Sequence, residues 1–128
     1  MSNKVVIALG SNASDSRSVI HLAGRLLADY FDWIRFSEPE YTLPVGLLGS
    51  AVFLNQVAVA RTQHGKQTVC RALKEIEKQL GRSPASENQG IVIVDIDLLQ
   101  WNEQLLKPDD WKRDYIQRGV AAISFESA

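Results

Sequence analysis

The sequence predicts a two-layer α+β fold, and three observations support this prediction. Four segments are rich in β-branched and apolar residues and read as strands, whereas two others carry apolar residues at helical spacing. The order of these segments is strand, helix, strand, strand, helix, strand. This order is the split βαβ, or ferredoxin-like, arrangement. It places both helices on one face of an antiparallel sheet and leaves the other face open.

Length and composition predict one domain over residues 1–128. The formal net charge of -1 argues against a binder of nucleic acid or membrane surfaces, because such a protein needs a basic excess. No apolar stretch approaches the roughly 20 residues that cross a bilayer. The N-terminus lacks the layout of a signal peptide, and the single cysteine fits a reducing compartment. We therefore expect a cytoplasmic protein.

The first half of the chain is expected to form two strands and a helix. Residues 4–9 read as a strand, and apolar residues at helical spacing predict a helix over residues 19–30. A second strand is expected over residues 33–41, where Pro39 makes it an edge strand or breaks it. Residues 42–50 contain one proline and two glycines and read as a loop.

In the second half of the chain, a strand, a helix and a further strand are again expected, and the signal for secondary structure is weaker after the last strand. A strand is expected over residues 51–62 and a helix over residues 66–80, followed by a polar loop at residues 83–90. Beyond the last strand, residues 101–110 suggest a hairpin or loop, and residues 111–116 suggest a short helical turn.

Two carboxylates on the last predicted strand, residues 91–99, are the most informative feature. Asp95 and Asp97 stand two positions apart, so both side chains face the same way, with Cβ atoms about 7 Å apart. Two neighbouring carboxylates repel each other unless a bound cation compensates their negative charge. Mg²⁺ bound together with a phosphate-bearing substrate is the usual cation. Alternatively, the two aspartates only keep an exposed sheet surface soluble.

Five short segments, in the same order and with plausible gaps, resemble those of the 6-hydroxymethyl-7,8-dihydropterin pyrophosphokinases, which are enzymes of folate synthesis. The segments are residues 5–12 (VVIALGSN), 41–46 (YTLPVG), 53–57 (FLNQV), 76–82 (IEKQLGR) and 95–99 (DIDLL). The resemblance covers about residues 4 to 100, which is most of the chain.

The resemblance implies transfer of pyrophosphate from ATP to the hydroxymethyl oxygen of a reduced pterin, with release of AMP. It implies that Asp95 and Asp97 hold two Mg²⁺ ions and that both residues act in catalysis together with Arg82. The residues it places at the pterin are Thr42, Leu43, Pro44, Phe53 and Asn55, and those it places at the nucleotide are Lys74, Glu77, Arg82 and Leu98.

Several positions depart from the family pattern. Asn88, Gln89 and Val92 stand where the family has arginine, tryptophan and arginine. Lost arginine contacts to ATP would be costly, at about 1.5–3 kcal/mol for each charged hydrogen bond. The cations that could replace these arginines are Lys107, Lys112, Arg113 and Arg118.

The C-terminal part departs as well. Val120 stands where the family has the phenylalanine that forms the second wall around the pterin, and Trp111 or Phe125 could replace it. An alternative function is therefore a non-catalytic relative that binds a pterin or a metal, or another protein. A further alternative is an assembly domain that dimerises through its open sheet face. The expected partners are ATP and a reduced pterin, and the expected state is a monomer or a weak homodimer.

Overall fold

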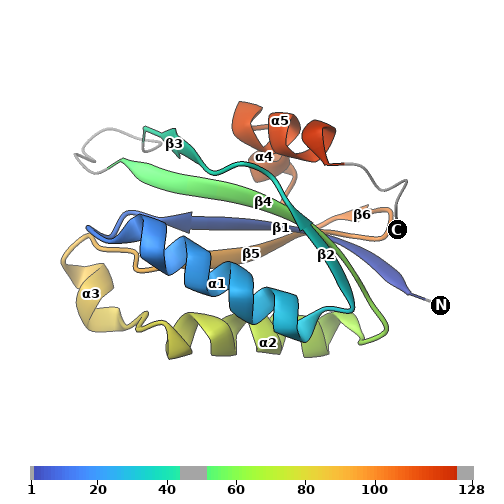
Figure 1. Cartoon of the computed structure of the whole chain (residues 1–128), viewed down its shortest axis with the longest axis horizontal. Helices are drawn as coiled ribbons and strands as arrows, with labels where there is room; N and C mark the ends of the chain where they lie inside the picture. Colours follow the sequence, from blue (N-terminus) through green and yellow to red (C-terminus); the bar gives the residue numbers. More distant parts are fainter. Residues whose placement is uncertain (1, 44–51, 124–128) are drawn as a thin grey trace.

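The computed structural model describes residues 2–43 and 52–123 (Figure 1). One antiparallel sheet has the strand order β2-β4-β1-β5-β6, and β3 pairs with β4 on the same edge as β2. The strands are β1 (Asn3–Ser11), β2 (Trp33–Phe36), β3 (Glu40–Thr42), β4 (Phe53–Thr62), β5 (Asp95–Trp101) and β6 (Gln104–Leu105). The helices are α1 (Ser16–Tyr30), α2 (Lys66–Gln79), α3 (Pro84–Asn88), α4 (Pro108–Trp111) and α5 (Asp114–Ala122).

The predicted ferredoxin-like fold is confirmed. Helices α1 and α2 cover one face of the sheet (Figure 1). Alternate residues of β1, β4 and β5 point into this layer and meet the apolar sides of the two helices. Ile7, Leu73 and Ile96 are examples, each at most 2% exposed. Burial of these side chains is the main source of folding free energy. None of the helices in the described ranges has the length and apolar character that a bilayer-spanning helix needs.

The predicted strand over residues 33–41 is divided in two. β2 ends at Phe36 and β3 begins at Glu40, on either side of Pro39. Proline lacks the N–H that a sheet ladder requires, which explains the break. The polar segment at residues 83–90, predicted as a loop, contains the short helix α3. Ser83 caps this helix by accepting a hydrogen bond from the backbone N–H of Ser86.

The last strand begins later than predicted. β5 starts at Asp95 rather than at residue 91, because β1 ends at Ser11 and offers no further ladder partner. Beyond that point the side chain of Asn12 replaces the ladder. Oδ1 of this side chain accepts from the N–H of Val92 at 2.6 Å, and the backbone N–H of Asn12 donates to the carbonyl of Val92 at 3.1 Å. The two acids therefore stand at the beginning of β5.

The second face of the sheet is covered in part, whereas the sequence predicted an open face. Helix α5 packs on β4 over a small apolar cluster that includes Val57, Leu99 and Ile116. Gly119 makes this approach possible, since a Cβ atom at this position would lie 2.6 Å from Cγ2 of Val57. Figure 1 shows α4 and α5 on the side of the sheet opposite α1 and α2. The remainder of this face forms a pocket.

Candidate active site

The pocket lies on the sheet face opposite α1 and α2, next to α4 and α5. Its volume is about 270 Å³. The floor is formed by Ala8 and Gly10 of β1, and the walls include Asp95 and Asp97 on one side and Asn55 on the other. Residues that are far apart in the sequence therefore meet here.

The register of the central strands explains this meeting. Gly10 of β1 pairs with Asn55 of β4 on one side and with Asp95 of β5 on the other. Neighbouring strands are about 4.8 Å apart, so Asn55 and Asp95 stand roughly 10 Å from each other across a residue without a side chain. A Cβ atom at Gly10 would lie 3.2 Å from Oδ1 of Asn55, so the absence of a side chain here keeps the floor of the pocket open between an amide and a carboxylate. Ala8 pairs with Asp97 and continues this floor.

Asp95 and Asp97 share one face, as the sequence predicted. Val94 and Ile96 point into the opposite face and are buried in the core. Burial and the neighbouring carboxylate of Asp97 raise the pKa of Asp95. Burial also acts to raise the pKa of Asp97, but hydrogen bonding with Asp95 and the ammonium of Lys107 outweigh it, so that this pKa lies below its usual range. The pKa values of the two neighbouring carboxylates are thus shifted in opposite directions.

Both aspartates form ion pairs with cations of the protein. Arg82 Nη1 lies 2.9 Å from Oδ1 of Asp95, and Lys107 Nζ lies 2.9 Å from Oδ1 of Asp97. Each ion pair uses one carboxylate oxygen. The side chains of Asp95 and Asp97 remain 39% and 21% exposed, so a ligand can still reach them.

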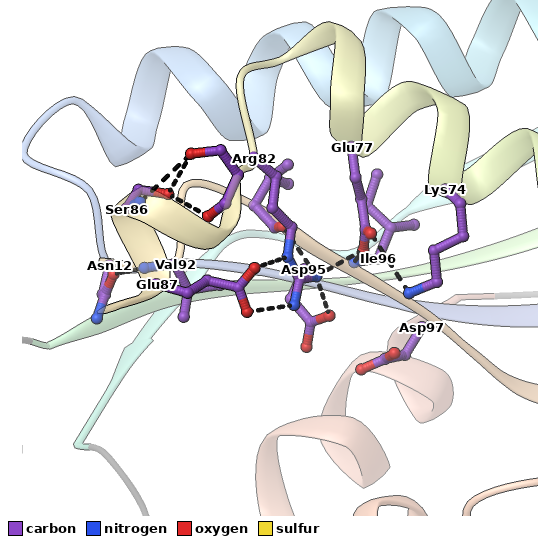
Figure 2. A network of polar contacts seen from close by, with 12 residues as sticks. Asn12, Lys74, Glu77, Arg82, Ser86, Glu87, Val92, Asp95, Ile96 and Asp97 are labelled. Carbon is purple, nitrogen blue, oxygen red and sulfur yellow. Dashed lines mark hydrogen bonds and ion pairs between the residues drawn. The ribbon is translucent and has the colours of Figure 1, made fainter. Parts of the chain in front are cut away.

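Arg82 is held by several acceptors at once (Figure 2). Its Nη1 donates to Asp95, to Glu77 at 3.0 Å and to the carbonyl of Val94 at 3.3 Å. Its Nε and Nη2 donate to the two carboxylate oxygens of Glu87, each at 3.3 Å. The hydrogen bonds with Glu87 and the surrounding carboxylates raise the pKa of Arg82. Its guanidinium is therefore fixed in position and only 23% exposed.

Glu77 joins the helical layer to the strand that carries the acids. It belongs to α2 and is 3% exposed. One carboxylate oxygen accepts from the backbone N–H of Ile96 at 2.7 Å and from Arg82, and the other accepts from Lys74 at 3.3 Å (Figure 2). Because Ile96 lies between the two aspartates, Glu77 fixes the backbone from which they project. This role was not evident from the sequence, where Glu77 was predicted to contact the nucleotide.

The structure brings together most of the predicted pterin-site residues. Thr42, Leu43, Phe53 and Asn55 all line the pocket that contains the aspartates. Asn55 is 6% exposed, and its Nδ2 donates to Oγ1 of Thr42 at 2.5 Å. Pro44 lies outside the residues that the structure describes.

The predicted nucleotide-site residues are arranged differently. Leu98 is 6% exposed and packs in the core between the sheet and the helices. Its side chain therefore faces away from the pocket, because it lies one position from Asp97 and strand side chains alternate. Lys74 is an exposed residue of α2 that pairs with Glu77. The pocket lining thus excludes the side chains of Lys74, Glu77 and Leu98.

Two polar residues of the pocket, Asp110 of α4 and Tyr115 of α5, were not predicted as site residues from the sequence. Arg113, which the sequence offered as a substitute cation, lines the pocket from the turn between these helices. Tyr115 is half-buried, and its burial raises the pKa of its hydroxyl. It places an aromatic ring at the pocket, whereas the predicted substitute Trp111 packs against the apolar cluster under α5. Phe125, the other candidate, lies outside the described residues. No motif in the sequence singles out Tyr115.

The donor set at the acid pair fits Mg²⁺ bound together with phosphate. Within residues 2–43 and 52–123, no group of three or more His, Cys, Asp or Glu side chains could hold a metal ion. Two carboxylates alone are too few for a cage made only of protein ligands. However, Mg²⁺ is usually held by one or two carboxylates, with water and substrate phosphates completing its octahedron. Asp95 and Asp97 supply that kind of partial site.

A larger cavity, of about 630 Å³, lies on the other side of the sheet. Arg17, His21 and Arg25 of α1 line it, opposite Phe36 and Tyr41. This cavity lacks paired carboxylates, so its size alone does not make it the site of chemistry. The smaller pocket combines polar side chains from β3, β4 and β5 with an electrostatically perturbed pair, which is the usual character of an active site.

Comparisons with known proteins show which family the sequence matches. The sequence matches the 7,8-dihydro-6-hydroxymethylpterin-pyrophosphokinase (HPPK) family over residues 6–124. It is 29% identical to the 2-amino-4-hydroxy-6-hydroxymethyldihydropteridine pyrophosphokinase of two strains of Porphyromonas gingivalis. These alignments cover 94% of this chain and 90% of the relative. It is 30% identical to the folate synthesis bifunctional protein of Arabidopsis thaliana, over 88% of this chain and 25% of the relative. Because the family match spans nearly the whole of its 128 residues, the chain belongs to the 7,8-dihydro-6-hydroxymethylpterin-pyrophosphokinase family.

Proposed function

We propose that this protein transfers the pyrophosphate group of ATP to the hydroxymethyl oxygen of 6-hydroxymethyl-7,8-dihydropterin, releasing AMP, and that the acid pair of β5 is the centre of this reaction. Family membership supports the reaction. The single observation that carries the assignment to this pocket is the row Asn55, Gly10 and Asp95 across three strands. It sets a group that can hydrogen-bond a flat heterocycle opposite a group that can serve a metal–phosphate complex.

The pterin would lie over Gly10, at the Asn55 side of the pocket. Phe53 offers an aromatic surface there, and Tyr115 offers another from α5. Aromatic contacts of this kind contribute about 0.5–1.5 kcal/mol beyond the area they bury. Thr42 holds the amide of Asn55 in place, because its hydroxyl accepts from Nδ2. A fixed amide recognises the edge of a heterocycle without first having to be ordered.

The nucleotide phosphates would lie at Asp95 and Asp97. Mg²⁺ ions bound there would neutralise phosphate charge and make the phosphorus more open to attack. The protein contributes the placement of both carboxylates on one rigid strand, which Glu77 fixes through the N–H of Ile96. Phosphoryl transfer depends chiefly on alignment and charge neutralisation, so fixed acids beside a fixed pterin suit the reaction. A cytoplasmic location and a monomeric or weakly dimeric state stay predictions from the sequence.

A non-catalytic, pterin-binding relative is the second candidate. Two observations favour it: both aspartates already form ion pairs, and Asn88 and Gln89, at the end of α3, stand where the family has arginine and tryptophan. In that case the pocket would bind a pterin without transferring phosphate. The two candidates differ in whether AMP is formed.

The test is to incubate the purified protein with ATP, Mg²⁺ and 6-hydroxymethyl-7,8-dihydropterin and to measure AMP and the pterin diphosphate by chromatography. We expect AMP only when all three are present. Asp95→Asn and Asp97→Asn should each lower turnover by about 100- to 1,000-fold or more, since each removes a charge that organises the phosphates.

Asp109→Asn is the matched control, because this exposed aspartate of α4 does not line the pocket. It should retain full activity. Pterin binding by calorimetry without any AMP, at high concentrations of protein and ATP, would favour the binding protein and refute the enzyme.

A further inference from the structure

The larger cavity lies on the other face of the sheet from the candidate active site. Leu54 and Gln56 of β4 line this cavity, whereas Phe53 and Asn55 of the same strand line the pocket of the acid pair. Successive side chains of a strand point to opposite faces, so the sheet separates the two spaces. The volume of about 630 Å³ falls within the range of about 300–1,000 Å³ that is typical of small-molecule sites.

One wall of the cavity is basic. Arg17, His21 and Arg25 stand four residues apart along α1, so their side chains share one side of the helix. Glu38 is the one acid among the described residues that line the cavity. Two arginines against one glutamate give this lining a positive excess, although the formal net charge of the whole chain is -1. The cavity therefore favours an anionic ligand.

Both arginines keep donors available for such a ligand. Among the residues that the structure describes, no ion pair joins Arg17 or Arg25 to an acid, although Asp29 follows Arg25 by about one helical turn. The guanidinium carbon of Arg17 lies 6.0 Å from the centre of the Tyr41 ring, and this cation–π arrangement leaves its N–H groups able to donate. With His21 between them on α1, three donor groups suit the three terminal oxygens of a phosphate monoester better than the two oxygens of a carboxylate.

The opposite wall is aromatic. Phe36 of β2 and Tyr41 of β3 line the cavity, and Pro39 of the segment between these strands lines it as well. Tyr41 is 51% exposed and Phe36 is partly buried, so a flat ring can contact both side chains. An inorganic anion would leave this wall unused. The cavity thus combines recognition of a phosphate on one side with recognition of a ring on the other.

We propose that this cavity is a second ligand site, which binds a small aromatic or heteroaromatic phosphate monoester. The phosphate accepts hydrogen bonds from Arg17, His21 and Arg25, and the ring packs against Phe36 and Tyr41. This inference goes beyond the proposed function and does not depend on it, because no described residue lines both this cavity and the pocket of the acid pair.

The test is a titration with phenyl phosphate, in which the amide signals of the protein are followed by NMR spectroscopy. We expect saturable shifts at the amides of Arg25, Tyr41 and Gln56, and no shifts at those of Gly10 and Asp97. Inorganic phosphate should bind about 10-fold more weakly, because it has no ring to pack against the aromatic wall.

Substitutions locate the site. Arg17→Gln and Arg25→Gln should each weaken the binding of phenyl phosphate about 10-fold, since each removes charge-assisted hydrogen bonds. Arg71→Gln is the matched control, because this exposed arginine of α2 does not line the cavity, and it should change the affinity less than about twofold. Asp95→Asn, which should impair the proposed reaction, should bind phenyl phosphate as the original protein does, so the two proposals can fail separately.

Three results would overturn the inference. Shifts confined to Gly10, Asp97 and their neighbours would place phenyl phosphate in the pocket of the acid pair and refute a second site. Unchanged affinity in both Arg17→Gln and Arg25→Gln, with the spectra showing folded protein, would refute the basic wall as the phosphate site. Inorganic phosphate that binds as tightly as phenyl phosphate would refute the aromatic ligand class.

Discussion

The face of the sheet under α1 and α2 differs from the opposite face in how its side chains change along a single strand. On β1, Val5, Ile7 and Leu9 point toward the helices, and each is at most 1% exposed. The alternate residues on the opposite face begin with Val6 in the apolar cluster under α5 and continue through Ala8 to Gly10 in the pocket. Along β1, the face toward the helices is thus apolar throughout. The opposite face changes from apolar packing at Val6 to the polar pocket at Gly10, within five residues.

The two faces of the sheet thus separate the residues that stabilise the fold from those that line the candidate active site. The helical face buries a continuous core, and no β1 side chain lines the larger cavity on that side of the sheet. The opposite face is covered by α5 only over part of its area, and the acids stand where that cover ends. Glu77 connects the two, since its buried carboxylate reaches from α2 to the backbone N–H of Ile96. We therefore expect substitutions on the face under α1 and α2 to affect stability and those in the pocket on the opposite face to affect binding. Substitutions at Glu77 should affect both.

The largest effect on stability is expected for Leu73→Ala. Leu73 is 2% exposed in the core between α2 and the sheet. Truncation should lower the free energy of unfolding by about 2–5 kcal/mol, because it removes buried area and leaves a cavity. Urea denaturation measures this loss. The control is Leu22→Ala, because Leu22 of α1 is 48% exposed, and it should cost less than about 0.5 kcal/mol. Equal losses in the two variants would contradict a core built on this face.

A smaller effect is expected at the connection, for Glu77→Gln. The amide can still accept from Ile96 but loses its charge, and with it the ion pairs to Arg82 and Lys74. The free energy of unfolding should fall by about 1–3 kcal/mol, at the lower end because Lys74 and Arg82 remain partly solvated. Glu75→Gln changes an exposed residue of the same helix and should leave stability unchanged. If both variants unfold at the same urea concentration, Glu77 does not support β5.

The smallest loss of stability is expected on the pocket face, for Gly119→Ala. The added methyl group would lie 2.6 Å from Cγ2 of Val57, so α5 must move away from β4. We expect a loss of about 1–2 kcal/mol, since overpacking outweighs the gain in helix propensity. Calorimetry measures the binding of the pterin. The loss of binding free energy should exceed the loss of unfolding free energy, because Tyr115 moves with α5.

Gly24→Ala, in the layer formed by α1 and α2, is expected to stabilise the protein, unlike Gly119→Ala. Gly24 lies within α1, where a Cβ atom would meet only ordinary contacts with Phe36 at 3.7 Å. This variant should gain up to about 1 kcal/mol, because alanine favours helix more than glycine does. If Gly119→Ala were to stabilise the protein as well, α5 would not pack as closely on Val57 as the structure indicates.

Much of the site could be predicted from local pattern because its residues lie on regular strands. The alternation around Asp95 and Asp97 predicted a shared face, and that face is shared in the structure. Asn55 and Phe53 were predicted from a resemblance, and they line the same pocket. Leu98 was placed at the nucleotide by the same resemblance, although its position next to Asp97 in the strand already directs its side chain to the core.

The order of the main helices and strands, the core face of each strand and the acid pair could all be predicted from the amino-acid sequence alone. These features depend on residues that are neighbours in the chain, and the period of 2 or 3.6 residues reports them directly. The three-dimensional fold was needed to show that Gly10 lies between Asn55 and Asp95 and that Glu77 is buried against β5. It was also needed to show that Arg113 and Tyr115 line the pocket and that Lys107 pairs with Asp97. These contacts join segments far apart in sequence, and they depend on strand register and on how closely α5 approaches the sheet, which no local pattern encodes.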